Sequence, residues 1–248
     1  MHKQKTFDEI VDGIKKLKDK GFIPSRRKGD TGIGKTLEYE LGIPDNSFKG
    51  PDGVDTELKS GRIDSGSMLT LFTKSPLPRG INTKLRIEYG YPDDNFKNKK
   101  VLRTTINATG FNSIQKSPDK VGFKITSIGD RIEIQASRPP KCIPDMETPY
   151  WKKEDLAKSV KGKYGDSLLY VKADVKTAGE NELFHYKEAY HLKGFDSDKL
   201  FKLLANGILD VDIRLGLYDD GRYHDHGTGI RIKPRLIDEC FSYKVQVV

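Results

Sequence analysis

The sequence predicts an α/β fold in which amphipathic helices and short strands are mixed along a chain of 248 residues. Three observations indicate this class. Thr6-Phe7-Asp8-Glu9 has the form of a capping box, and apolar residues follow it at helical spacing until Gly21. Segments 121–128 and 131–136 alternate polar and apolar residues around a Gly-Asp turn, as the strands of a hairpin do. Further strands are predicted over 168–175 and 184–192, after a helix at 151–160.

The remaining predicted elements complete a mixed sheet with flanking helices. A short helix around residues 37–41 ends before Gly42 and Pro44. A later helix is capped near Asp196 and ends at Gly207. The other predicted strands cover residues 57–59, 67–76, 208–216 and 230–233.

The composition indicates which kind of partner and which cellular compartment to expect. The net charge of +8 and a pI of about 9.2 favour a polyanionic partner. Cys142 and Cys240 are too few and too far apart for a zinc ribbon or a disulfide scaffold, which favours a reducing compartment. No apolar run has membrane-spanning length, and the chain starts with a charged segment rather than a signal-peptide core. We therefore expect a cytoplasmic protein with no membrane partner.

The segment from Pro51 to Lys59 predicts a site with an acid and a base on one face of a strand. Because side chains alternate along a strand, Glu57 and Lys59 share a face. Asp52 comes from the turn made by Pro51 and Gly53 and reaches back to the same place. Two carboxylates beside a lysine suit a hard divalent cation such as Mg²⁺ and a water that becomes a nucleophile. The alternative is an ordinary solvated strand.

A second motif, Gly29-x-x-x-x-Gly34-Lys35-Thr36, matches the nucleotide-binding P-loop and raises the alternative of an NTPase. Its context disfavours this interpretation, because a P-loop follows a buried strand and opens a long helix. Here the preceding residues are basic and broken by Pro24, and the following helix is short. A basic, glycine-rich helix start can equally bind a DNA phosphate. Glu38 on that helix could add a third acid to the site.

The segment from residue 208 to residue 233 predicts a polar surface suited to bases. Val211, Ile213 and Leu215 face a core, so Asp212 and Arg214 face outward together. The chain then returns through His224-Asp225-His226 to a strand with Arg231 outward. Arginine donates twice to guanine, and a carboxylate accepts from the cytosine amino group. A structural polar network and a metal site at the two histidines remain alternatives.

Several blocks together resemble the MvaI/BcnI family of type II restriction endonucleases, which is similar to the mismatch-repair nicking enzyme MutH. The blocks are residues 27–36, Pro51-Asp52 with Glu57-Leu58-Lys59, 69–76, 211–214 and 224–228. The resemblance implies a PD-(D/E)XK, restriction-endonuclease-like and MutH-like core, with a mixed sheet flanked by helices and two lobes around a DNA cleft. The expected division is a mainly catalytic lobe at 1–100, a β-rich connecting region at 101–150, and a recognition lobe with the remaining core at 151–248.

The resemblance also assigns roles to residues. Asp52 and Glu57 correspond to metal-binding carboxylates, Lys59 to the catalytic lysine, and Glu38 to the helix glutamate of MutH-like sites. The expected DNA-binding residues are Lys28, Lys35, Thr73, Lys74, Asp212, Arg214, His224, Asp225, His226 and Arg231. Residues 101–143 match the family poorly, and no contact is assigned to them.

The implied reaction is Mg²⁺-dependent hydrolysis of double-stranded DNA at a CCNGG-type site by a monomer that nicks each strand in turn. The 224–228 block is more similar to MvaI than to BcnI, which favours CCWGG. A separately encoded DNA methyltransferase is an expected partner. The alternatives are a MutH-like nicking enzyme of DNA repair, a P-loop NTPase, and a DNA-binding protein without catalysis.

Overall fold

The computed structural model describes residues 4–44, 50–64, 66–117 and 119–248, so the first residues of the charged N-terminal segment lie outside the described part. The chain forms two compact units. Unit 1 contains residues 1–67, 160–196 and 237–248, and unit 2 contains residues 68–159 and 197–236. The units are interleaved along the chain, whereas the lobes expected from the resemblance are consecutive ranges. One division falls within α4 (Lys153–Tyr164), and another falls within the 3-10 helix η1 (Pro234–Cys240).

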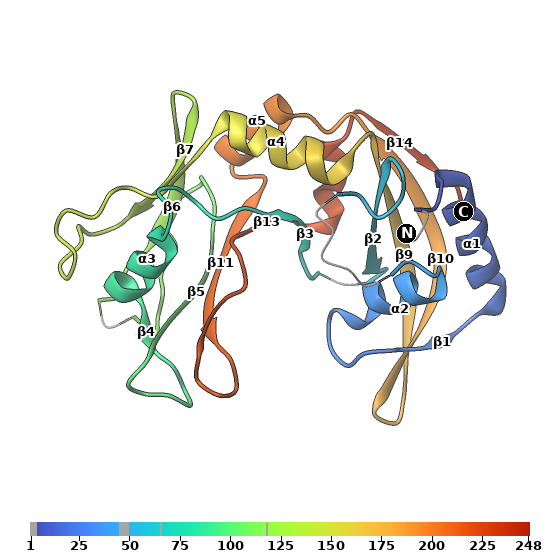
Figure 1. The fold of residues 1–248 in the computed structure, drawn as a ribbon, viewed down its shortest axis with the longest axis horizontal. Helices are drawn as coiled ribbons and strands as arrows, with labels where there is room; N and C mark the ends of the chain where they lie inside the picture. The colour runs from blue at the N-terminus through green and yellow to red at the C-terminus, as the bar shows by residue number, and fades with distance from the viewer. Residues whose placement is uncertain (1–3, 45–49, 65, 118) are drawn as a thin grey trace. The chain divides into compact units, whose positions relative to one another are not determined.

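Unit 1 is built on a five-stranded mixed sheet (Figure 1). Its strands are β1 (Ile23–Pro24), β2 (Thr56–Arg62), β9 (Ser167–Ala178), β10 (Asn181–Lys193) and β14 (Tyr243–Gln246). β10 and β9 form a long antiparallel pair, β2 runs parallel to β9 at one edge, and β1 and β14 both pair with β10. β2 is therefore an edge strand, with one side of its backbone open.

The apolar core of unit 1 lies between one face of this sheet and the helices α1 (Phe7–Lys20) and α2 (Gly32–Glu40). The predicted capping box is confirmed: the Glu9 backbone N–H donates to Thr6 Oγ1 at 3.3 Å, and the Thr6 N–H donates to Glu9 Oε2 at 2.7 Å. Leu58 of β2 and Leu169 of β9 are paired in the sheet and belong to the core. Because side chains alternate, the neighbours of Leu58 point to the opposite face.

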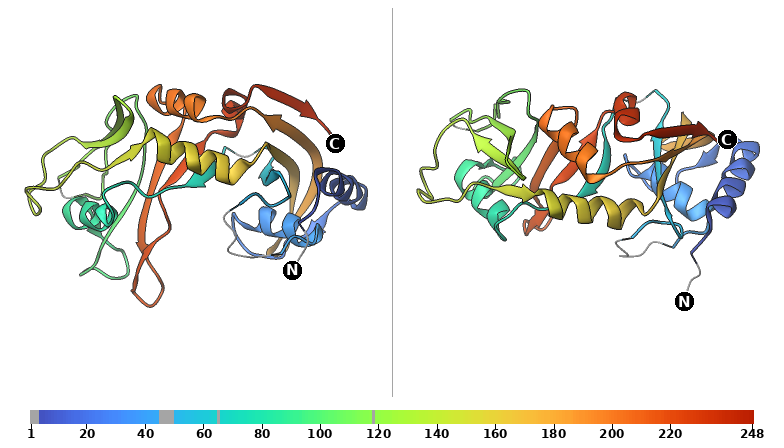
Figure 2. Two further views of the ribbon diagram at one scale, coloured as in Figure 1. Left: turned by 45° about the horizontal axis from the view of Figure 1, so that its top comes forward. Right: turned by 90° about the horizontal axis from the view of Figure 1, so that it is seen from above.

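Unit 2 holds a six-stranded sheet in the order β3-β13-β11-β5-β4, with β12 paired to β11. The strands are β3 (Leu69–Thr73), β4 (Tyr91–Pro92), β5 (Lys100–Ile106), β11 (Asp210–Leu217), β12 (Tyr223–Asp225) and β13 (Gly229–Ile232). One face is buried through Leu102, Ile106, Val211, Ile213, Ile230 and Ile232. The helix α3 (Ile81–Tyr89) packs beside β5 (Figure 2). The other face is left for polar side chains.

A second sheet of unit 2 contains β6 (Phe123–Ile128), β7 (Arg131–Ala136) and β8 (Tyr150–Lys152), and α5 (Ser197–Ala205) packs against its first two strands. The predicted hairpin at Gly129-Asp130 is confirmed. The prediction that Trp151 starts a helix is wrong, because the helix begins at Lys153. Trp151 instead pairs with Ile132, and its buried indole N–H donates to the Lys74 carbonyl oxygen at 2.8 Å. Strand pairing overrides the local helical pattern here.

Cys142 is exposed and Cys240 is buried, and neither forms a disulfide. Among the described residues, no helix combines the length and apolarity needed to span a membrane.

Candidate active site and polar sheet face

The turn before β2 and the start of β2 bring Asp52, Glu57 and Lys59 together. Asp52 Oδ2 accepts a hydrogen bond from the Leu58 backbone N–H at 3.0 Å, which fixes the carboxylate beside the strand. Lys59 Nζ donates to Glu57 Oε1 at 3.1 Å, as expected for two side chains on one strand face. The turn itself closes through a hydrogen bond from the Gly53 N–H to the Thr56 carbonyl oxygen at 2.9 Å. The geometry predicted for these three residues is present in the structure.

Glu57 is 1% exposed, on the sheet face opposite to the α1 and α2 core. Its strand partner is the buried Leu168 of β9. Burial raises the pKa of the Glu57 carboxyl above its usual range; Lys59 opposes this shift, and the negative charge of Asp52 adds to it. Glu57 Oε2 accepts no hydrogen bond among the described residues, although the atom is buried. A buried carboxylate oxygen without a donor is costly unless a cation or water completes it.

A second lysine, Lys163, contacts Glu57, although the sequence predicted no role for it. Its Nζ lies 2.9 Å from Glu57 Oε1. Lys163 stands in the last turn of α4, and the chain turns directly after it at Gly165, whose φ of 56° favours glycine. Gly165 bridges to Thr56, so the end of α4 is held against the start of β2. No spacing rule links Glu57 and Lys163, which are far apart in the sequence. The only signal in the sequence for this contact is that Lys163 is a basic residue near the end of a predicted helix.

The donor set fits a hard divalent cation. Asp52 and Glu57 are negatively charged neighbours, and Glu57 Oε2 has no partner among the described residues. Mg²⁺ is commonly held by one or two carboxylates and keeps several waters. Within the described part of the chain, no group of three or more His, Cys, Asp or Glu side chains could hold a metal ion. Asp52 and Glu57 would be the carboxylates that hold the cation.

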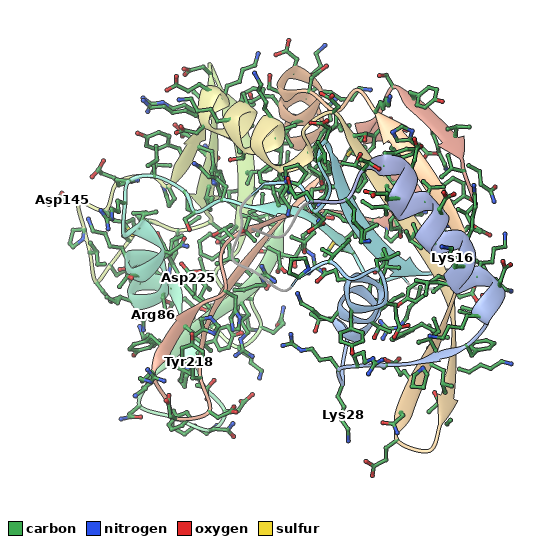
Figure 3. All side chains as sticks on the ribbon, turned by 45° about the vertical axis from the view of Figure 1, so that its right-hand side comes forward. Lys16, Lys28, Arg86, Asp145, Tyr218 and Asp225 are labelled. Atoms are coloured by element: carbon green, nitrogen blue, oxygen red, sulfur yellow. The ribbon has the colours of Figure 1, made fainter. Side chains whose placement is uncertain are left out.

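Glu38 forms an ion pair with Lys35 at 2.8 Å on α2. Among the described residues, no hydrogen bond joins it to Asp52 or Glu57, and its role as a third acid stays a prediction. The P-loop alternative also lacks its required setting, because β1 is a two-residue edge strand and α2 begins at Gly32 and has nine residues. Lys28 is 78% exposed, forms an ion pair with the exposed Glu180, and extends away from the ribbon (Figure 3).

The polar face of the unit 2 sheet collects most of the other predicted residues. Asp212 accepts hydrogen bonds from Arg231 Nη1 at 2.7 Å and from Thr105 Oγ1 at 3.1 Å, so one carboxylate joins three strands. Arg231 also donates to the Met68 carbonyl oxygen at 2.8 Å. Arg214 donates to the His226 carbonyl oxygen at 3.2 Å. These internal bonds hold the guanidinium groups in fixed directions.

His224 and His226 lie together at the β11–β12 hairpin. The His224 ring stacks on Tyr218 with ring centroids 4.0 Å apart, and its centroid is 3.8 Å from that of His226. Burial lowers the pKa of His226, and the positive charges of His224 and Arg214 lower it further. Asp225 uses its carboxylate within the unit, accepting from Asn82 Nδ2 and the Gly227 N–H, each at 2.8 Å. It therefore fixes the turn that presents the histidines.

Thr73 and Lys74 end β3 on the neighbouring edge of the same sheet. Thr73 is exposed and pairs with Gly229, and the Lys74 N–H donates to the Thr228 carbonyl oxygen at 2.9 Å. The unit 2 residues named in the sequence analysis thus share one sheet, whereas Asp52, Glu57, Lys59, Glu38, Lys28 and Lys35 belong to unit 1.

In this basic α/β protein, two neighbouring acids and two lysines gather at the start of an edge strand, which are features of a hydrolase for a polyanionic substrate. Comparison with known proteins identifies the class of enzyme. Residues 11–241 match the model of the MvaI/BcnI restriction endonuclease family, and the chain belongs to this family. It is therefore an enzyme of the type II site-specific endonuclease class.

Two solved structures are similar over almost the whole chain. The restriction endonuclease MvaI in its complex with cognate DNA shares 29% identity, with a TM-score of 0.87, covering 97% of this chain and 98% of MvaI. MvaI in the absence of DNA shares 28% identity, with a TM-score of 0.58 and complete coverage of both chains. A search of curated proteins gave no match. The family resemblance and the mixed α/β fold expected from the sequence are confirmed.

Proposed function

We propose that this protein hydrolyses phosphodiester bonds of double-stranded DNA, with Mg²⁺, at a CCNGG-type site in which CCWGG is favoured. The observation that carries the proposal is the cluster of Asp52, Glu57 and Lys59, whose lysine is hydrogen-bonded to a buried carboxylate with one free oxygen. The similarity to MvaI in its complex with cognate DNA supports the substrate. The enzyme acts as a monomer with one active site, and therefore nicks the two strands in separate steps.

Each residue of the site has a role in this reaction. Asp52 and Glu57 would hold the cation, which would supply Lewis-acid stabilisation of the phosphate charge and a more acidic water. Lys59 orients the attacking water and offsets negative charge that develops on the phosphate. The water gives up a proton to the solvent as its oxygen attacks phosphorus in line, the bond to the 3′ oxygen breaks, and the leaving oxygen takes a proton from the solvent. The products are a 5′-phosphate and a 3′-hydroxyl.

The polar face of unit 2 supplies recognition. The Asp212–Arg231 pair and Arg214 present a carboxylate and guanidinium groups in directions fixed by internal bonds. Guanine offers two acceptors to such a guanidinium, and the cytosine amino group offers a donor to the carboxylate. His224 and His226 contact the central base pair. The phosphates are bound by Lys28, Lys35, Thr73 and Lys74. These contacts fix the register of the protein on the duplex but do not read the base sequence.

Digestion of an unmethylated plasmid of known sequence tests the proposal. Discrete ends that need Mg²⁺, disappear with EDTA and are lost with Lys59→Ala are expected, and their shared sequence distinguishes CCWGG from CCSGG. Binding of a labelled duplex by Lys59→Ala in EDTA serves as the folding control. Intact DNA with the wild-type enzyme and Mg²⁺, despite normal binding, would overturn the proposal. Nicks that never become double-strand breaks would favour the MutH-like alternative.

A further inference from the structure

The central part of the chain contributes an arginine to the polar face of unit 2. Arg103 lies on β5 and is paired in register with Arg214 of β11, so the two side chains share a sheet face. Residues from about 101 to 143 carry no family block, yet β5 is an inner strand of this sheet, between β11 and β4. The segment without a sequence motif thus lies beside the residues with the clearest recognition chemistry.

Arg103 differs from the other two arginines of this face in having free donors. Arg231 is bound by Asp212 and the Met68 carbonyl oxygen, and Arg214 donates to backbone carbonyl oxygens. Arg103 is exposed and makes no hydrogen bond or ion pair with any residue in the described ranges. A guanidinium has five N–H donors in a rigid fork. None of these donors is bound by another described residue, so the guanidinium keeps donors for a ligand.

The Arg103 guanidinium nevertheless has a defined position against the backbone of β11. A Cβ atom added to Gly216 would lie 2.8 Å from Arg103 Nη2 and 3.4 Å from Arg103 Nε, and no other residue's atoms come as close to that position. Gly216 thus leaves the space that the guanidinium fills. A guanidinium placed against a strand loses less freedom on binding than one on a flexible stem.

The surroundings of Arg103 favour an acceptor from a ligand. Arg214 faces it across the strand pair, and the positive charge of Arg103 contributes to lowering the pKa of the nearby His226. Asp94, whose pKa the positive charge of Arg103 helps to lower, is paired with Lys116 at 2.7 Å. Asp212 lies 3.7 Å from Arg214 Nε, whereas no carboxylate among the described residues forms an ion pair with Arg103. Acceptors that arrive with a substrate would therefore stabilise the Arg103 guanidinium.

We propose that Arg103 determines sequence specificity by donating both arms of its guanidinium to the N7 and O6 atoms of one guanine in the recognition site. This inference rests on the proposed function. A guanine fits better than a phosphate because the guanidinium is seated on the same sheet face as Asp212 and Arg214. Bidentate arginine–guanine pairs contribute about 1–3 kcal/mol of discrimination, which corresponds to roughly 5- to 150-fold in relative affinity.

Competition binding in EDTA tests the assignment with the full-length protein. The probes are the wild-type recognition duplex, defined from the cleavage ends, and duplexes in which each guanine is replaced singly. Arg103→Ala is expected to lose roughly 5- to 150-fold discrimination at one guanine position and to keep its preference at the others. Arg103→Lys keeps the charge but not the fork and should lose most of the same discrimination. Lys84→Ala, which removes an exposed cation of α3, should change nothing.

Gly216→Ala is the matched second variant, because it keeps Arg103 and displaces its guanidinium. We expect it to relax discrimination at the same guanine, with an unchanged unfolding midpoint. Equal weakening for all duplexes, with a salt slope reduced by about one, would assign Arg103 to a phosphate and overturn the inference. Unchanged discrimination in Arg103→Ala would overturn it as well. A wild-type protein without any sequence preference would instead refute the proposed function, and the inference with it.

Discussion

Among the described residues, each unit contains one glutamate that is almost completely buried, and the pKa values of the two carboxyls are shifted in opposite directions. Glu57 in unit 1 is 1% exposed and Glu88 in unit 2 is 3% exposed. Burial raises the pKa of Glu57, while the pKa of Glu88 is lowered to about 2 although burial alone would raise it. Equal burial thus does not decide the charge state; the donors around each carboxylate do.

The donors of Glu88 complete both of its oxygens. Glu88 Oε1 accepts from the Lys141 N–H at 2.6 Å and from Arg138 Nη1 at 3.0 Å. Glu88 Oε2 accepts from the Cys142 and Ile143 N–H groups at 2.6 and 2.9 Å. Glu57, in contrast, has two lysines on one oxygen, and within the described part of the chain no donor reaches the other. The completed carboxylate holds a loop in place, and the incomplete one has capacity left for a cation.

The largest effect expected from this comparison belongs to Glu57→Gln. In the proposed function Glu57 holds the cation, so loss of its carboxylate should lower the cleavage rate on the order of 10³-fold. The free energy of unfolding of the metal-free protein should stay equal or rise at neutral pH. A raised folded pKa means that ionisation destabilises the fold as the pH rises above 4.5, and Gln removes this penalty. Cleavage assays and thermal unfolding without metal measure both quantities.

The exposed Glu239 provides the control for that substitution, since Glu239→Gln should alter neither quantity. A Glu57→Gln protein that cleaves at the wild-type rate would contradict the assignment of Glu57 to the site.

Glu88→Gln should show the reverse pattern. The shift of the Glu88 pKa from 4.5 to about 2 corresponds to about 3 kcal/mol of folding stability. Since the folded pKa is lowered, this contribution is present above pH 4.5 and is lost as the pH falls toward 2. Gln should therefore destabilise the protein at pH 7 and reduce the loss of stability on acidification. Denaturant unfolding at a series of pH values, compared with the wild type, measures the difference, and equal curves would contradict the role of Glu88.

Lys163→Met sharpens the comparison by removing one of the two lysines from Glu57. We expect the cleavage rate to fall roughly 10- to 100-fold, the range for residues that support a metal-binding side chain. Binding of the duplex in EDTA should be unchanged. Lys163→Arg, which keeps a donor and a charge, should recover part of the rate, whereas a simple packing role would give no recovery from the bulkier side chain. A wild-type cleavage rate in Lys163→Met would contradict the assignment of Lys163 to the site.

Arg138→Met is the matched change in unit 2 and should have the smallest effect. It removes one donor from Glu88 but leaves the three backbone N–H groups. The expected cost is about 1–2 kcal/mol of folding stability, with an unchanged cleavage rate per folded molecule. Thermal unfolding and cleavage at a temperature well below the transition separate the two. A cleavage rate that falls as far as in Lys163→Met would show that the two carboxylates do not differ in role.

Local patterns in the sequence predicted a good part of the fold. The capping box at Thr6, the hairpin at Gly129-Asp130, and the sharing of one face by Glu57 and Lys59 all appear as expected. Each depends on residues within a few positions of one another, where backbone geometry alone fixes which side chains meet. The candidate pair of carboxylates could therefore be predicted from nine consecutive residues, Pro51 to Lys59.

The sequence by itself determined the acidic strand, its lysine and the family of the chain, because these depend on local spacing and recurring blocks. Only the tertiary structure decided that Lys163 completes one oxygen of Glu57, that Trp151 joins a strand, and that Arg103 stands beside Arg214. These contacts join residues far apart in the chain. They exist because strand pairing and burial bring distant segments together, and no spacing in the sequence encodes which segments will pair.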